Sequence, residues 1–255
     1  MGPDVALFVP CYVDQLSPGV AWATLSVLER AGCRVSYDPG QTCCGQPWIN
    51  LGARDAARRL AKRHLDRFGD AEVVVSPSAS CVATVRHRYA GLDVCAAGDD
   101  RTERTYELGE FLVHRLGVTK LGSRFPYRVA VLPSCHGLRE LGLGTPSERG
   151  PAAAQPSPVE SLLAEVEDLV RVEAARPDEC CGFGGAFSVT HPTLSGRMGR
   201  ARLRAFADAG ADYVTGTDVS CLIHLDGIRR REGFGPRTIH LAEILANGAL
   251  PEAAP

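Results

Sequence analysis

Short runs of apolar and β-branched residues alternate with helical stretches along the chain, and this alternation predicts the fold. In the first half, residues 5–10, 34–37 and 73–75 are expected to form strands. Residues 19–30 and 53–68 have the apolar spacing and the composition of helices. Strands that alternate with helices indicate a parallel sheet with right-handed crossovers. We therefore expect an α/β fold.

The second half of the chain repeats the order of the first, which indicates an internal duplication. Two further segments, expected to be helical, also match each other in sequence, at residues 105–112 and 238–245. We therefore expect two homologous Rossmann-like units with parallel sheets, residues 1–122 and residues 123–255. The repeated elements are strands at 127–132, 169–173 and 212–215, and helices at 158–165 and 194–209.

The second unit is longer than the first at one place. The extra residues fall within 144–157, a stretch rich in Pro, Ala, Ser and Gly. Such a composition predicts a solvated loop, so the insertion leaves the common plan of the two units unchanged.

Composition and charge limit the kind of protein and its partners. The 255 residues are 45% apolar, which is enough for a buried core. The 28 basic and 30 acidic residues give a net charge of -2, so nothing indicates binding to nucleic acid. The apolar run at residues 5–10 is too short for a secretory leader or a membrane span. We expect a cytoplasmic protein.

Ten cysteines are many for a reducing compartment, where disulfides are not maintained. Cys-Cys-Gly occurs twice, at matching places in the two units, so coincidence is a poor explanation. Cys33 and Cys95 lack a counterpart in the other unit and are interpreted as a core cysteine and a loop cysteine. The eight repeated cysteines are Cys11, Cys43, Cys44 and Cys81 in the first unit and Cys135, Cys180, Cys181 and Cys221 in the second.

The repeated cysteines follow the carboxyl ends of predicted parallel strands, where open α/β sheets form their ligand sites. Each unit is therefore expected to gather four thiolates at one site. Thiolates are the ligands of structural zinc and of iron-sulfur clusters. Neighbouring cysteines favour a cluster, because zinc sites normally space their cysteine ligands by two to four residues. Zinc in one of the two units remains an alternative.

Five other residues are candidates for contact with the bound group. Gly45 and Gly182 give the backbone room and supply N–H groups toward sulfur. His136 follows Cys135, and Ser78 and Asp218 precede Cys81 and Cys221 by three residues. Asp218 is an oxygen ligand, a proton acceptor or, as we favour, the N-cap of the helix at Cys221.

Other kinds of chemistry leave no trace in the sequence. The run at residues 182–185 lacks the third glycine of the dinucleotide fingerprint, so a bound nicotinamide or flavin is not expected. No catalytic triad or paired carboxylate site stands out. The catalytic residues, if any, are therefore unknown.

Three motifs resemble those of the cysteine-rich CCG-domain proteins, which include polypeptides of heterodisulfide reductase and glycolate oxidase. The motifs are residues 41–47 (QTCCGQP), 134–139 (SCHGLR) and 180–189 (CCGFGGAFSV). The fuller family motif ends in Cys-x-x-Cys, and the resemblance implies five thiolates per unit around a noncubane [4Fe-4S] cluster. Here Ser78 and Asp218 replace the first cysteine of each pair. The resemblance therefore leaves a noncubane cluster, a cubane [4Fe-4S] cluster and zinc open.

The resemblance is closest to the lactate utilization members of the family. It implies an iron-sulfur electron-transfer subunit of a system that oxidises L-lactate to pyruvate, with partner subunits resembling lactate utilization proteins B and C. One alternative is a cluster-based thiol-disulfide oxidoreductase like heterodisulfide reductase. The other is a zinc-stabilised structural protein.

Overall fold

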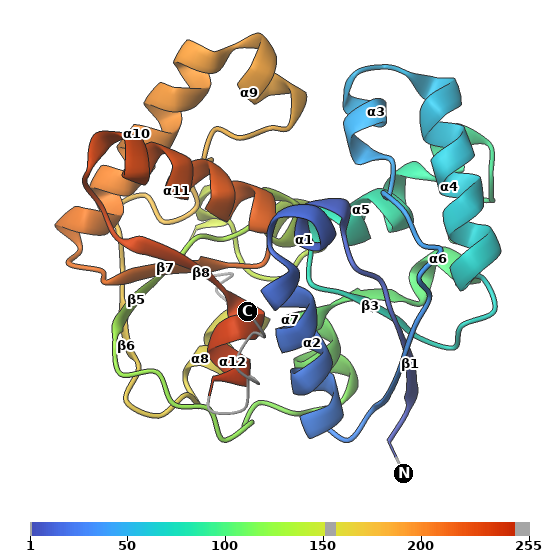
Figure 1. The fold of residues 1–255 in the computed structure, drawn as a ribbon, viewed down its shortest axis with the longest axis horizontal. Helices are drawn as coiled ribbons and strands as arrows, with labels where there is room; N and C mark the ends of the chain where they lie inside the picture. The colour runs from blue at the N-terminus through green and yellow to red at the C-terminus, as the bar shows by residue number, and fades with distance from the viewer. Residues whose placement is uncertain (1, 151–156, 248–255) are drawn as a thin grey trace.

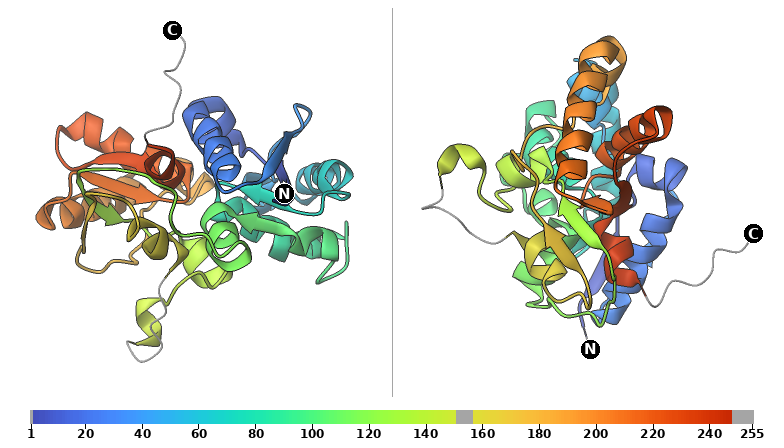
Figure 2. Two further views of the ribbon diagram at one scale, coloured as in Figure 1. Left: turned by 90° about the horizontal axis from the view of Figure 1, so that it is seen from below. Right: turned by 90° about the vertical axis from the view of Figure 1, so that its left-hand side faces the viewer.

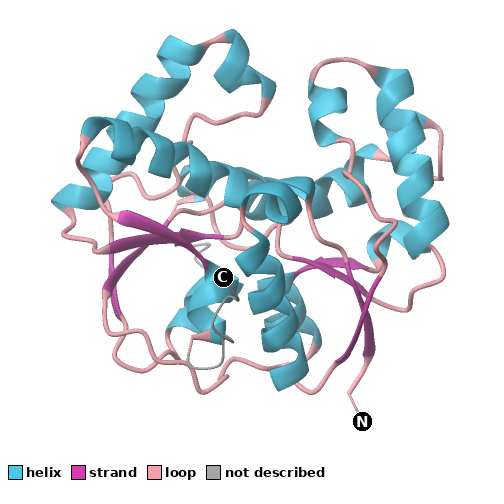
Figure 3. Ribbon diagram, in the orientation of Figure 1, coloured by secondary structure: helices cyan, strands magenta, loops and turns pink. Residues whose placement is uncertain are grey.

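Two four-stranded parallel sheets organise the chain (Figures 1 and 3). The computed structural model describes residues 2–150 and 157–247. The strand orders are β2-β1-β3-β4 and β6-β5-β7-β8. The strands are β1 (Asp4–Leu7), β2 (Arg34–Tyr37), β3 (Val74–Ser76), β4 (Thr105–Glu107), β5 (Arg128–Val131), β6 (Val170–Val172), β7 (Tyr213–Gly216) and β8 (Arg237–His240). The common order confirms the α/β fold of two similar units.

Helices link successive strands within each unit. The α-helices are α1 (Cys11–Leu16), α2 (Pro18–Arg30), α3 (Gln46–Asn50), α4 (Arg54–Phe68), α5 (Ala79–Arg88), α6 (Asp100–Glu103), α7 (Leu108–Glu110), α8 (Pro158–Leu163), α9 (Ala186–Thr190), α10 (Pro192–Asp208), α11 (Val219–Glu232) and α12 (Leu241–Ala246). Shorter helical segments are the 3₁₀ turns η1 (Ala90–Leu92) and η4 (Ser147–Arg149) and the π-helical turns η2 (Phe111–Arg115) and η3 (His136–Glu140).

Helices α4 and α10 show the duplication in their packing. Buried residues recur with the same spacing in both helices, at 57, 61, 64, 65 and 68 in α4 and at 195, 199, 202, 203 and 206 in α10. This spacing places one stripe of each helix against its unit. His64 and Arg202 are thus equivalent, and each lies against a phenylalanine four residues later, Phe68 or Phe206.

A shared apolar core holds the two units together. Helices α2 and α12 lie between the two sheets (Figures 1 and 2). Val20 and Val27 of α2 belong to the same buried cluster as Leu241 and Ile244 of α12. The two sheets therefore keep separate hydrogen bonding while the core between them is continuous.

The expected helices over residues 105–112 and 238–245 are wrong in their first three residues. Thr105–Glu107 and Arg237–His240 are strands, each paired in parallel with its neighbour β3 or β7. Helical structure begins only at Leu108 and Leu241. Threonine, tyrosine and isoleucine favour strands, and a free sheet edge was available for them.

The predicted loop over residues 144–157 lies partly outside the described residues, at 151–156. Its described part contains the 3₁₀ turn η4. The Arg139 guanidinium and the backbone N–H of Ser147 both donate hydrogen bonds to Asp178 Oδ2, and the donor–acceptor distance is 2.9 Å in each case. These contacts hold the start of the loop near the residues that lead to Cys180.

Candidate metal centres

All eight repeated cysteines line a single cavity of about 160 Å³. Each follows the carboxyl end of a strand of its own sheet, as the sequence predicts. The predicted sets of four are not two isolated sites, however, because both sets face the same space. Cys44, Cys81 and Cys181 are buried, and the other five are half-buried.

Within each unit the thiols form a chain of contacts. Cys44 Sγ lies 3.3 Å from Cys81 Sγ, and the equivalent Cys181 Sγ lies 3.0 Å from Cys221 Sγ. The first cysteine of each unit also hydrogen-bonds the first cysteine of the Cys-Cys-Gly motif. The two sets therefore have the same internal arrangement of four sulfur atoms.

One thiol in each set is strongly acidified. Hydrogen bonds from Cys11 and then Cys44 lower the pKa of Cys43 to about 3. In the second unit, hydrogen bonds from Cys135 and then Cys181 lower the pKa of Cys180 to about 2. The same contacts raise the pKa of the neighbouring thiols, Cys11 and Cys44 in the first unit and Cys135 and Cys181 in the second, so each set shares its protons unequally.

Glycine is required after each cysteine pair. Gly45 and Gly182 have φ angles of +90° and +88°, which L side chains rarely adopt. In this conformation Gly45 N donates to Cys43 Sγ at 3.4 Å, and Gly182 N donates to Cys180 Sγ at 3.3 Å. A Cβ on Gly182 would also lie 2.7 Å from Ser195 O. Both glycines thus direct backbone N–H groups toward sulfur, as expected.

Cys81 and Cys221 lie in the first turns of α5 and α11, where the helix dipole favours a thiolate or an anionic cluster. Ser78 is the N-cap of α5, and its Oγ accepts from Cys81 N at 3.3 Å. Asp218 occupies the N-cap position of α11 but makes no side-chain bond to that helix. The expected capping by Asp218 is therefore wrong for its carboxylate, which accepts hydrogen bonds from Ser78 and Ser80 of the first unit and from Ser134 instead.

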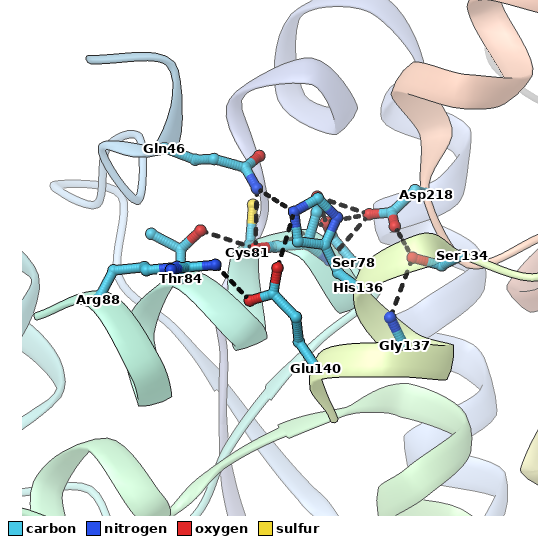
Figure 4. A network of polar contacts seen from close by, with 11 residues as sticks. Gln46, Ser78, Cys81, Thr84, Arg88, Ser134, His136, Gly137, Glu140 and Asp218 are labelled. Carbon is cyan, nitrogen blue, oxygen red and sulfur yellow. Dashed lines mark hydrogen bonds and ion pairs between the residues drawn. The ribbon is translucent and has the colours of Figure 1, made fainter. Parts of the chain in front are cut away.

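Two contacts between the units flank the cavity and are related by the duplication. The ring of Tyr12 meets that of Phe183 edge to face, 5.8 Å between centroids. At the equivalent place, Gln46 Nε2 lies 3.1 Å from His136 Nε2 (Figure 4). In each case the residue after the first cysteine of one unit meets the residue after Cys-Cys-Gly of the other. The cavity therefore has one aromatic side and one polar side.

Sequence reasoning missed two residues that support the cysteine motifs from behind. Tyr89 is fully buried, and its hydroxyl donates to Cys44 O at 3.0 Å. Arg202 is also fully buried, and its guanidinium donates to three backbone carbonyls in the loop before Cys180, those of residues 175, 176 and 177. Neither belongs to a motif. An arginine within a helical stripe whose other members are small or apolar was the only signal for Arg202.

Cys33 and Cys95 lie away from the cavity, as their lack of a counterpart predicts. Cys33 belongs to the core between the units, and Cys95 packs against a smaller cluster around α4 and α5.

Across residues 2–150 and 157–247, no three His, Cys, Asp or Glu side chains are arranged around one metal ion. Over the same residues, no helix has the length and apolar character to cross a bilayer.

The sets still suit a soft metal group by the chemistry of their donors. Each offers four sulfur atoms in sequential contact, one of them strongly acidified, with a backbone N–H directed at the thiolate. Thiolates are ligands of zinc and of iron-sulfur clusters alike. The contacts alone therefore do not choose between these two groups.

Known proteins match this chain over nearly its whole length. The family described as the cysteine-rich CCG domain matches residues 5–86 and 129–226. Lactate utilization protein A of Macrococcus caseolyticus is 38% identical over 95% of this chain and 96% of its own. The protein of the same name from an Exiguobacterium species is 37% identical over 96% of this chain and 98% of its own. The chain belongs to the cysteine-rich CCG-domain family and contains two regions that match it.

Proposed function

We propose that the chain is an iron-sulfur electron-transfer subunit of a system that oxidises L-lactate to pyruvate. The observation that carries the proposal is the pair of equivalent four-thiol sets facing one cavity. The substrate comes from the names of the relatives, which are 37 to 38% identical over nearly the whole chain. Neighbouring redox groups in one cavity suit the passage of electrons from one to the other.

The proposed ligands are Cys11, Cys43, Cys44 and Cys81 for one group and Cys135, Cys180, Cys181 and Cys221 for the other. When bound, iron-sulfur clusters, [4Fe-4S] in our proposal, supply sites that accept and release single electrons. Gly45 and Gly182 direct N–H groups at the ligand sulfurs, which tunes such sites. Ser78, His136 and Asp218 lie on the cavity wall beside the thiols.

Oxidation of lactate to pyruvate releases two electrons and two protons, and it requires a base beside the substrate. We assign this base and the binding of lactate to partner subunits resembling lactate utilization proteins B and C. The same proposal locates the chain in the cytoplasm, where ten free cysteines stay reduced.

The test follows the colour of the cluster-loaded chain under anaerobic conditions. We expect lactate to bleach its visible absorption when the two partner subunits are present and to leave it unchanged when they are absent. Pyruvate formed by the purified chain alone with an artificial acceptor would make it a catalytic subunit. Turnover by the partners without any reduction of this chain would remove it from the electron path.

The shared cavity also favours a second function. In this function the chain reduces a disulfide substrate that lies between the two cysteine sets. A disulfide takes up two electrons and two protons to give two thiols, and two neighbouring one-electron groups are able to supply the electrons. The test is reoxidation of the dithionite-reduced chain by a small disulfide, with release of two thiols per disulfide. Absence of both changes would exclude this function for the chain.

A further inference from the structure

The carboxylate of Asp218 joins the two units at the wall of the cysteine cavity. The residue is 4% exposed, and both of its oxygens accept hydrogen bonds (Figure 4). Asp218 Oδ1 accepts from Ser78 Oγ at 2.7 Å, from Ser80 Oγ at 2.7 Å and from Ser80 N at 3.1 Å. Asp218 Oδ2 accepts from Ser134 Oγ. Donors from both halves of the chain thus meet on one side chain.

The carboxylate of Asp218 caps helix α5 of the first unit and makes no hydrogen bond to its own helix α11. The N–H of Ser80 is one of the orphan donors in the first turn of α5, and the Asp218 carboxylate satisfies it. Ser78 satisfies the next one, that of Cys81. A negative charge at this position also faces the positive end of the helix dipole. Helix α5 is therefore capped from the second unit as well as from its own N-cap.

The network ties three cysteine-bearing segments together. Ser80 precedes Cys81 and Ser134 precedes Cys135, while Asp218 precedes Cys221 by one helical turn. Ser134 Oγ further accepts from Gly137 N at 3.2 Å, at the start of η3. Movement of the carboxylate would therefore disturb backbone on both sides of the cavity.

Apolar packing alone does not fix this geometry. The core between α2 and α12 is held by contacts that have little directional preference. A buried carboxylate is costly unless it is fully hydrogen-bonded, so only arrangements that keep its four donors in place are favourable. In some proteins, buried polar groups of this kind select one arrangement among several of similar packing.

We propose that Asp218 is a positioning residue that caps helix α5 of the opposite unit and thereby fixes the two cysteine sets around one cavity. The proposal is independent of the metal group, because every contact that supports it is between side chains and backbone of this chain.

The test is hydrogen exchange of the full-length chain, read by mass spectrometry or NMR in the metal-free and the loaded forms. In Asp218→Ala we expect the amides of Ser80 and Cys81 to exchange at least tenfold faster, whereas the first turn of α11 changes little. Asp226→Asn, which removes a charge from the same helix outside the network, is the matched control. Faster exchange confined to residues 219–222, or no difference from the control, would overturn the proposal.

Two further variants keep the proposal testable if Asp218→Ala folds poorly. Asp218→Asn retains an oxygen for Ser80 N, so exchange at Ser80 should return toward the wild-type rate. Ser134→Ala leaves the Asp218 carboxylate but removes the hydrogen bond that holds it within the second unit. We expect the Ser80 amide to exchange a few fold faster in this variant. Wild-type exchange at Ser80 in Ser134→Ala, together with no recovery in Asp218→Asn, would contradict the role of Asp218.

Discussion

Ser78 and Asp218 occupy equivalent positions in the two units and are hydrogen-bonded to each other, with Ser78 Oγ 2.7 Å from Asp218 Oδ1. Because equivalent residues of the two units contact each other here, an approximate two-fold axis between the units passes close to this bond. These are also the two positions where the fuller family motif has a further cysteine. In this chain the space between the sets holds a hydrogen-bonded polar bridge, and four thiols remain in each unit.

The proposed ligands are tested by removing one thiol from each set. We expect Cys44→Ser or Cys181→Ser to lower the bound iron by about half, because each belongs to one set of four and metal binding depends on the whole set. Cys33→Ser is the control, since Cys33 is equally buried but lies in the core away from the cavity. Iron per chain in anaerobically purified protein is the measurement. Equal loss in all three variants would refute the ligand assignment.

Arg202→Leu tests the support of the second Cys-Cys-Gly motif. The guanidinium holds the carbonyls of residues 175, 176 and 177, and hydrogen bonds to charged groups contribute roughly 1.5 to 3 kcal/mol each. Leucine also removes the cost of burying the guanidinium, which offsets part of this loss, so we expect the free energy of unfolding in urea to fall by about 3 kcal/mol, with loss of metal from the second set. Arg204→Leu, an exposed position on the same helix, should change it by less than about 0.5 kcal/mol. Equal effects of both substitutions would exclude the supporting role.

Glu107 gives the stability of the protein a defined pH dependence. Burial raises the pKa of its carboxyl from 4.5 to about 8. The folded chain therefore binds this proton more tightly than the unfolded chain, so stability is lost as the pH rises from 4.5 toward 8. Buried His64 and His240 act in the opposite direction, because burial lowers their pKa from 6.5 to about 3 and about 4. Their contribution is complete above pH 6.5.

The acidified thiols of Cys43 and Cys180 also bind different numbers of protons in the folded and unfolded chain between pH 6.5 and 8, so Glu107 is isolated only by comparing the wild type with Glu107→Gln across this window. At about 1.4 kcal/mol per pKa unit, we expect the free energy of unfolding to fall by about 2 kcal/mol more in the wild type than in Glu107→Gln across this window. Urea titrations at several pH values measure the difference. Parallel curves for the two proteins would show that Glu107 is ionised in the folded state well below pH 8.

The duplication and most of the strands of both sheets could be predicted from the sequence. Strands such as Val74–Ser76 are short, rich in β-branched residues and followed by a cysteine motif. The edge strands β4 and β8 were missed, since three or four residues that lead directly into a helix give little periodicity. Their strand conformation depends on pairing with β3 and β7. The boundary expected between residues 122 and 123 stays a prediction.

The sequence predicts which cysteines line the cavity but not how the two sets come together, and their role as ligands stays a prediction. Repetition identified the eight cysteines, but nothing local to either motif shows that the two sets face one cavity. That arrangement depends on contacts between residues far apart in the sequence, such as Tyr12 with Phe183 and Gln46 with His136. The role of Asp218 was missed for the same reason, because its partners Ser78 and Ser80 lie about 140 residues earlier.

The central claim is that the two thiol sets hold iron-sulfur clusters, and metal and acid-labile sulfide analysis of anaerobically purified protein tests it most directly. We expect a brown protein with iron and sulfide in nearly equal amounts. Stoichiometric zinc without sulfide would contradict the claim and favour a zinc-stabilised structural protein.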